Sequence, residues 1–127
     1  MRILLVDDSK DITEAVSFYC QSEDISYKVV NEGKKALDSI RHEKFDLILL
    51  DLAMPDFSGK DVIKSLKEEG ILESNNVVIF TASSDRIVLD KIKNSGIKEI
   101  FKKPFSLDSL IKLREISAHE MILHLAE

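Results

Sequence analysis

Short runs of uninterrupted apolar residues constrain the fold of this chain more than any other feature of its sequence. The clearest runs are residues 3–6 (ILLV), 47–50 (LILL) and 77–80 (VVIF), and two stretches that each include one charged residue occupy residues 27–30 (YKVV) and 99–101 (EIF). A strand with one face in water alternates apolar and polar residues, whereas an uninterrupted run is typical of a strand covered on both faces. The pattern therefore predicts a parallel sheet with helices on either side.

The segments between these runs carry apolar residues at helical spacing. In the first segment, the residues at i, i+3, i+4 and i+7 are Ile12, Ala15, Val16 and Tyr19. They form one apolar stripe on a helix. Residues 36–40 and 62–66 repeat this pattern, and Gly70 and Gly96 stand where helices are expected to end. Five strand–helix units in succession predict an α/β fold, a doubly wound five-stranded parallel sheet with right-handed crossovers.

Two of the predicted helices begin with the spacing of a capping box, in which residues three apart exchange side-chain and backbone hydrogen bonds. Asp11 precedes Glu14 by three positions, and Ser58 precedes Asp61 by three. We therefore expect Asp11 and Ser58 to cap these helices.

The last predicted helix, at about residues 106–125, is longer than this sheet needs. Ser106 can cap it, and neither glycine nor proline interrupts the chain from there to Glu127. At 1.5 Å per residue such a helix would reach roughly 30 Å. Three alternatives stay open: it packs back on the domain, pairs with a second copy in a homodimer, or is the stem of a removed segment. We expect residues 1–127 to form a single domain.

The charge balance argues against nucleic acid and membrane partners. Lys and Arg number 18 against 23 Asp and Glu, for a net charge of -5, so the chain lacks a basic footprint for either surface. The first apolar run stops at Asp7 and Asp8, far short of a signal-peptide core or a membrane span. The single cysteine, Cys20, has no internal disulfide partner and is expected to be a small buried residue. We expect a cytoplasmic protein.

Polar side chains follow the predicted strands at the points where the strands end. Asp7 and Asp8 follow the first strand, Asp51 the third, Thr81 the fourth and Lys103 the fifth. Ligands of an open parallel α/β sheet bind at the carboxyl ends of its strands. We therefore expect these side chains to share one site.

The residue types at this site suit phosphoryl transfer. Three carboxylates in one place repel one another unless a cation lies among them, and Mg²⁺ suits such oxygen ligands together with a substrate phosphate. Lys103 and Thr81 would then bind phosphoryl oxygens, beside a carboxylate nucleophile. Each residue alone also has a structural interpretation: Asp8 as a cap, Thr81 as a loop residue, and the Lys-Pro pair as a turn. Their joint occurrence at four strand ends favours the functional interpretation.

Four stretches carry a resemblance to a known family. They are residues 3–9 (ILLVDDS), 49–55 (LLDLAMP) with Gly59, 80–82 (FTA) and 102–105 (KKPF). Over residues 1 to about 113, the chain resembles the response regulator receivers of two-component signalling, in particular single-domain receivers of the chemotaxis-regulator type. The resemblance implies a flavodoxin-like (βα)5 fold with strand order 2-1-3-4-5.

The same resemblance implies the role of each site residue. Asp51 would be the phosphoacceptor, and Asp7, Asp8 and Asp51 would hold Mg²⁺ together with the backbone carbonyl of Ala53. The donor would be a phosphohistidine on a sensor histidine kinase or a histidine phosphotransfer protein. The output would be a phosphorylation-dependent surface change that reaches a downstream protein or an output domain. We therefore expect a phosphoacceptor signalling protein that assists its own phosphorylation and dephosphorylation, rather than an enzyme.

The chain departs from the family pattern at one position. An aromatic residue commonly lies three positions before the lysine, but here that residue is Ile100 and the aromatic one is its neighbour Phe101. Successive strand residues point to opposite faces, so Phe101 does not substitute for it. We expect Ile100 to fill the core, with a variant switch as the alternative.

Two other classes of protein are alternatives to a receiver. A phosphatase of the haloacid dehalogenase type also forms an aspartyl phosphate, but its signature has a second Asp two residues after the nucleophile. Here Ala53 follows Asp51 at that distance, and Ser9 follows Asp7. A receiver-like adaptor that is never phosphorylated is expected to lack some of the site residues, all of which are present. The chain is compatible both with a complete receiver and with the receiver of a larger regulator.

Overall fold

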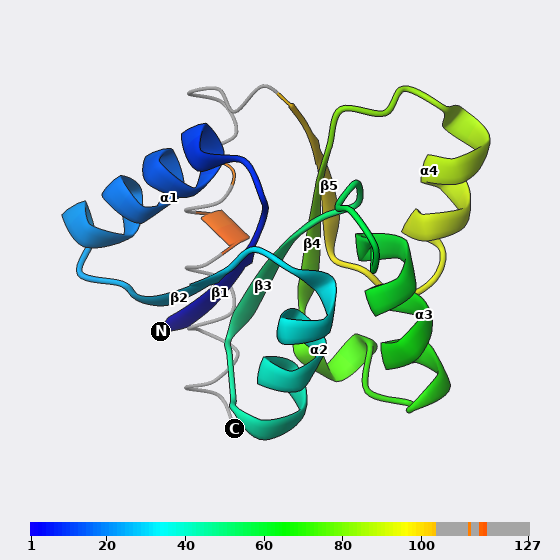
Figure 1. Cartoon of the computed structure of the whole chain (residues 1–127), viewed down its shortest axis with the longest axis horizontal. Coiled ribbons are helices and arrows are strands. Elements are labelled where there is room, and N and C mark those ends of the chain that lie inside the picture. The colour runs from blue at the N-terminus through cyan, green and yellow to red at the C-terminus, as the bar shows by residue number, and fades with distance from the viewer. Residues whose placement is uncertain (104–111, 113–114, 117–127) are drawn as a thin grey trace.

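The structure is a computed structural model, and it describes residues 1–103, 112, 115 and 116. One parallel sheet contains five strands in the order β2-β1-β3-β4-β5 (Figure 1). The strands are β1 (Arg2–Val6), β2 (Ser26–Val30), β3 (Leu47–Asp51), β4 (Val77–Thr81) and β5 (Glu99–Lys102). The helices are α1 (Lys10–Ser22), α2 (Gly33–His42), α3 (Gly59–Glu68) and α4 (Arg86–Lys93), with a 3₁₀ turn η1 (Glu73–Asn75). The predicted α/β fold and strand order are confirmed.

Helices cover both faces of the sheet and enclose two apolar layers. On one face, α1 packs its Val16 and Cys20 against strand residues such as Leu49 (Figure 1). On the other face, α2, α3 and α4 cover the neighbouring strand residue Leu50. Every residue of β3 and β4 is buried. Because odd and even positions both face a helix layer, both need apolar side chains, which explains the uninterrupted runs.

Asp51 and Thr81 end their strands rather than follow them. The sheet register of β3 with β4 continues through Asp51, and that of β4 with β5 continues through Thr81. Parallel pairing therefore extends one residue beyond each apolar run. Both polar side chains consequently project from backbone that the sheet holds in place.

The predicted N-cap is confirmed for α3 and wrong for α1. Ser58 Oγ accepts the backbone N–H of Asp61 at 3.3 Å, and the Ser58 N–H donates to Asp61 Oδ2 at 2.9 Å. By contrast, Ser9 is the N-cap of α1, so Asp11 lies inside its first turn. The reason is a contact outside the helix: the Asp7 carboxylate accepts the Ser9 N–H at 2.8 Å and fixes the turn before Asp11 is reached.

The predicted final helix at residues 106–125 lies outside the described residues, except for Lys112, Glu115 and Ile116, which are helical. Its pairing in a homodimer and the extent of a single domain over residues 1–127 stay predictions. Among the helices that are described, none has both the length and the apolar character that a bilayer crossing requires.

Candidate functional site

The structure brings the predicted site residues together at the carboxyl edge of the sheet. Carboxylate oxygens of Asp7, Asp8 and Asp51 all lie within 4.8 Å of one another. The Lys103 ammonium lies 3.0 Å from Asp7 Oδ2 and 3.3 Å from Asp51 Oδ2. Thr81 is buried at the end of β4, and its carbonyl accepts the backbone N–H of Lys103 at 2.8 Å. The edge thus carries three carboxylates, an ammonium group and a hydroxyl.

One local motif orients three of these side chains. Asp7, Asp51 and Thr81 each accept a hydrogen bond from the backbone N–H two residues later. The donors are the amides of Ser9 at 2.8 Å, Ala53 at 3.1 Å and Ser83 at 3.0 Å. Asp and Thr side chains commonly form such turns. The sequence analysis did not predict these three backbone amide donors. An Asp or Thr at the end of an apolar run is the pattern that could have indicated them.

Burial and mutual charge determine the protonation of the site. Burial raises the pKa of the Asp51 carboxyl, and the Asp7 charge adds to that rise against the opposing Ala53 amide and Lys103 ammonium. Burial lowers the pKa of Lys103, but the carboxylates of Asp7 and Asp51 outweigh that effect and leave the pKa raised. Lys103 is therefore positively charged at neutral pH.

The donor set fits a hard divalent cation. Asp7 Oδ2 is buried, and the Lys103 ammonium lies 3.0 Å from it. Three carboxylates facing one ammonium group leave excess negative charge. Mg²⁺ prefers oxygen ligands of this kind and keeps several waters. The side chains of Asp7, Asp8 and Asp51 therefore fit this ion, whereas a ligand role for the Ala53 carbonyl stays a prediction.

Comparison with known proteins assigns the chain to a family. The family model of the response regulator receiver domain matches residues 3–115. The chain belongs to the response regulator receiver family. The DNA-binding response regulator MtrA of Mycolicibacterium paratuberculosis is 31% identical over 110 residues, which make up 87% of this chain and 48% of MtrA. The chain thus spans about half the length of the curated relatives it matches.

Solved receiver structures share this fold. The receiver domain of the Francisella response regulator 1452 is 27% identical with a TM-score of 0.81, and the match covers 93% of this chain and 97% of that one. The response regulator TrrA of Thermotoga maritima, solved in complex with Mg²⁺-BeF, is 28% identical with a TM-score of 0.75, over 91% of this chain and 97% of that one. This chain is therefore a receiver of two-component signalling, from a family of phosphoacceptor signalling proteins.

Gly59 lets α3 of the receiver approach the end of β3. Its N–H donates to the Leu52 carbonyl at 3.0 Å. A Cβ atom at Gly59 would lie 2.0 Å from the Asp51 carbonyl oxygen and 2.7 Å from Leu52 Cα. Glycine is therefore needed here for space, and it allows the helix to pack directly beside Asp51.

The receiver places Ile100 and Phe101 on opposite faces of the sheet, as predicted. Phe101 is buried in the α1 layer, where its ring centroid lies 5.2 Å from that of Phe80. Ile100 is half-buried and packs in the other layer with Ile92 of α4. Ile100 therefore contributes to the core at the expected position.

Proposed function

We propose that this receiver accepts a phosphoryl group on Asp51 from a phosphohistidine of a sensor histidine kinase or phosphotransfer protein, with Mg²⁺ bound by Asp7, Asp8 and Asp51. The observation that carries the proposal is the pair of contacts from Lys103 Nζ to Asp7 and Asp51. A buried carboxylate beside a charged lysine, at the ligand-binding edge of the sheet, suits a nucleophile that receives an anionic group.

The transfer exchanges one bond to phosphorus for another. A carboxylate oxygen of Asp51 attacks phosphorus, so that a P–O bond forms while the P–N bond to the histidine ring breaks. The electron pair of that bond stays on the ring nitrogen. Because the other ring nitrogen carries a proton, the imidazole leaves as a neutral group. Bound Mg²⁺ would supply positive charge against the phosphoryl oxygens.

Lys103 and Thr81 would bind the phosphoryl group. The Lys103 ammonium contacts both Asp7 and Asp51, and it would pair with a phosphoryl oxygen once the Asp51 carboxylate is phosphorylated. Thr81 Oγ1 accepts the Ser83 N–H at 3.0 Å. Its hydroxyl proton is consequently available to donate to a second phosphoryl oxygen.

The same site would also lose the phosphoryl group, by hydrolysis of the aspartyl phosphate. The chain would therefore assist its own phosphorylation and dephosphorylation without turning over a separate substrate. The phosphatase alternative is less well supported because Ala53 stands where its second Asp is required. The adaptor alternative is less well supported because the three carboxylates lie within 4.8 Å of one another and Lys103 pairs with two of them.

The output would be protein contact. The curated relatives include regulators named as DNA-binding that are about twice as long as this chain. A receiver with a net charge of -5 is not itself expected to bind nucleic acid. We propose that the phosphorylated receiver acts on a downstream protein or on an output domain.

Intact mass spectrometry tests this proposal. The protein is incubated with acetyl phosphate, with and without Mg²⁺, beside an Asp51→Asn variant. We expect one added phosphoryl group on the wild type, only with Mg²⁺, removed by hydroxylamine and absent from the variant. If neither acetyl phosphate nor a phosphorylated kinase gives an adduct, the adaptor alternative replaces the proposal.

A further inference from the structure

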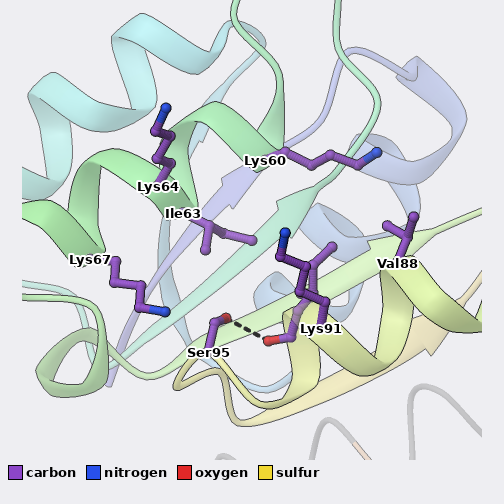
Figure 2. Close-up of a pocket in the computed structure, with 8 residues that line it drawn as sticks. Lys60, Ile63, Lys64, Lys67, Val88, Lys91 and Ser95 are labelled. Carbon is purple, nitrogen blue, oxygen red and sulfur yellow. Dashed lines mark hydrogen bonds between the residues drawn. The ribbon is translucent and has the colours of Figure 1, made fainter.

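A groove between α3 and α4 lies outside the phosphorylation site (Figure 2). Its cavity volume is about 450 Å³, and its apolar floor consists of Ile63, Val88 and Ile92. In α4, Ile92 is buried, whereas Val88 and Leu89 pack against the core while only partly buried. By contrast, α3 buries Val62, Ile63 and Leu66 against the sheet. We refer to this feature as the α3–α4 groove.

Lysine side chains line the groove beside its apolar residues. Lys60, Lys64 and Lys67 project from α3, and Lys91 projects from α4 (Figure 2). All are exposed, and none takes part in an ion pair within the described part of the chain. The charge of Lys64 helps to lower the pKa of the Asp61 carboxyl, so part of the Lys64 charge is balanced by that carboxylate. In a chain of net charge -5, this cluster concentrates positive charge on one part of the surface.

The lining indicates the chemistry of an occupant. Lysine ammonium groups are point charges that pair with carboxylates. Neither an arginine fork for phosphate nor an aromatic ring for a nucleobase is among the described lining residues. Lys60 and Lys67 are ~10 Å apart along α3 at ~1.5 Å per residue, and an extended peptide covers that distance in about three residues. Acidic side chains three positions apart would therefore reach both lysines.

We propose that the α3–α4 groove docks an acidic segment of a partner protein. Carboxylates of the segment pair with the lysines, and an apolar side chain between them packs on Ile63, Val88 and Ile92. Burial of that side chain contributes affinity. The charges contribute specificity and a faster encounter.

The groove adjoins the phosphorylation site without overlapping the carboxylates. It shares Lys60 and Val88 with a cavity that Ala53 and Thr81 also line. A docked segment would therefore lie beside the acceptor site and leave it open. Docking does not require the phosphoryl group, so it is tested on the unphosphorylated chain.

Fluorescence polarisation with a labelled synthetic peptide, EELEELEE, measures docking. The peptide QQLQQLQQ removes the charges, and EESEESEE removes the apolar side chains. We expect EELEELEE to bind and each control peptide to bind about tenfold more weakly. On binding, methyl NMR signals of Ile63, Val88 and Ile92 are expected to shift.

Matched double charge reversals locate the binding surface. The first double variant, Lys67→Glu with Lys91→Glu, reverses two charges in the groove. The second, Lys34→Glu with Lys93→Glu, reverses two exposed charges outside the groove, so the net charge of the protein changes equally in both. We expect the first pair to weaken binding about tenfold and the second pair less than about twofold. The proposal is overturned by equal weakening from both pairs or by no binding of EELEELEE. It is also overturned if phosphatidylserine vesicles, rather than the peptide, bind in a manner that depends on Lys67 and Lys91.

Discussion

Replacing Gly59 by alanine tests the closest backbone approach in the receiver. The new Cβ atom would lie 2.0 Å from the Asp51 carbonyl oxygen and 2.8 Å from its carbonyl carbon. Both are backbone atoms, which no rotamer change can move. The connection between β3 and α3 therefore has to shift by roughly 1 Å or more to restore ordinary contact distances.

The expected loss of stability in Gly59→Ala is the difference between a steric cost and an entropic gain. Overpacking against rigid backbone costs about 3 kcal/mol. Alanine gains about 1 kcal/mol or less over glycine at the first position of α3, because glycine loses more backbone entropy on folding. The net loss is about 2 kcal/mol, which lowers the melting temperature of a domain this size by roughly 7 °C. A shift of Asp51 also slows phosphorylation about tenfold or more.

Gly70→Ala is the matched control, because Gly70 has a positive φ of 72° but an added Cβ atom would meet no other atom within 4 Å. Its cost is that of the left-handed backbone alone, a net loss of about 1 kcal/mol or less, with an unchanged phosphorylation rate. Thermal unfolding by circular dichroism and the rate of labelling by acetyl phosphate measure both effects. A Gly59→Ala protein as stable as the wild type, or a more damaging Gly70→Ala, would refute the steric reasoning.

Three other predictions test burial, capping and metal binding separately. Burial raises the pKa of the Cys20 thiol from 9.0 to about 11, so the unfolded thiol ionises first and stability falls as pH rises through that window. The free energy of urea unfolding is measured for the wild type and for Cys20→Ser, and the difference between them is expected to shrink between about pH 8 and about pH 11. A difference that does not change with pH contradicts this. Ser58→Ala is expected to lose about 1 kcal/mol in the same assay, whereas Ser9→Ala changes little because its side chain makes no cap hydrogen bond; equal losses argue against the cap. Asp8→Asn is expected to weaken Mg²⁺ about tenfold in calorimetric titration, with little effect on metal-free stability because Asp8 is exposed; unchanged affinity excludes Asp8 as a ligand.

The sheet and the site residues were predictable because each depends on a local pattern. The uninterrupted runs of β3 and β4 reflect burial on both faces, which requires apolar residues at successive positions. A polar residue at the end of such a run, such as Asp51 or Thr81, marks the edge where the ligand of a parallel sheet binds. Because parallel strands end at the same edge of the sheet, pairing of adjacent strands is enough to bring residues from distant parts of the sequence to one place.

Contacts between separate elements were not predictable in the same way. The capping rule favoured Asp11, but the Asp7 carboxylate binds the Ser9 amide and moves the start of α1. The α3–α4 groove depends on how α4 lies against α3. Lys60 and Lys67 share a helix, but no spacing rule relates them to Lys91. Such contacts follow from packing between elements rather than from periodicity within one.

The central claim is that Asp51 is the phosphoacceptor, and reductive trapping of the aspartyl phosphate tests it most directly. After labelling with acetyl phosphate and Mg²⁺, borohydride reduces the acyl phosphate and converts the acceptor aspartate to homoserine, which peptide mass spectrometry locates. We predict homoserine at position 51 and at no other aspartate. Homoserine at Asp7, Asp8 or Asp56 in its place would contradict the account.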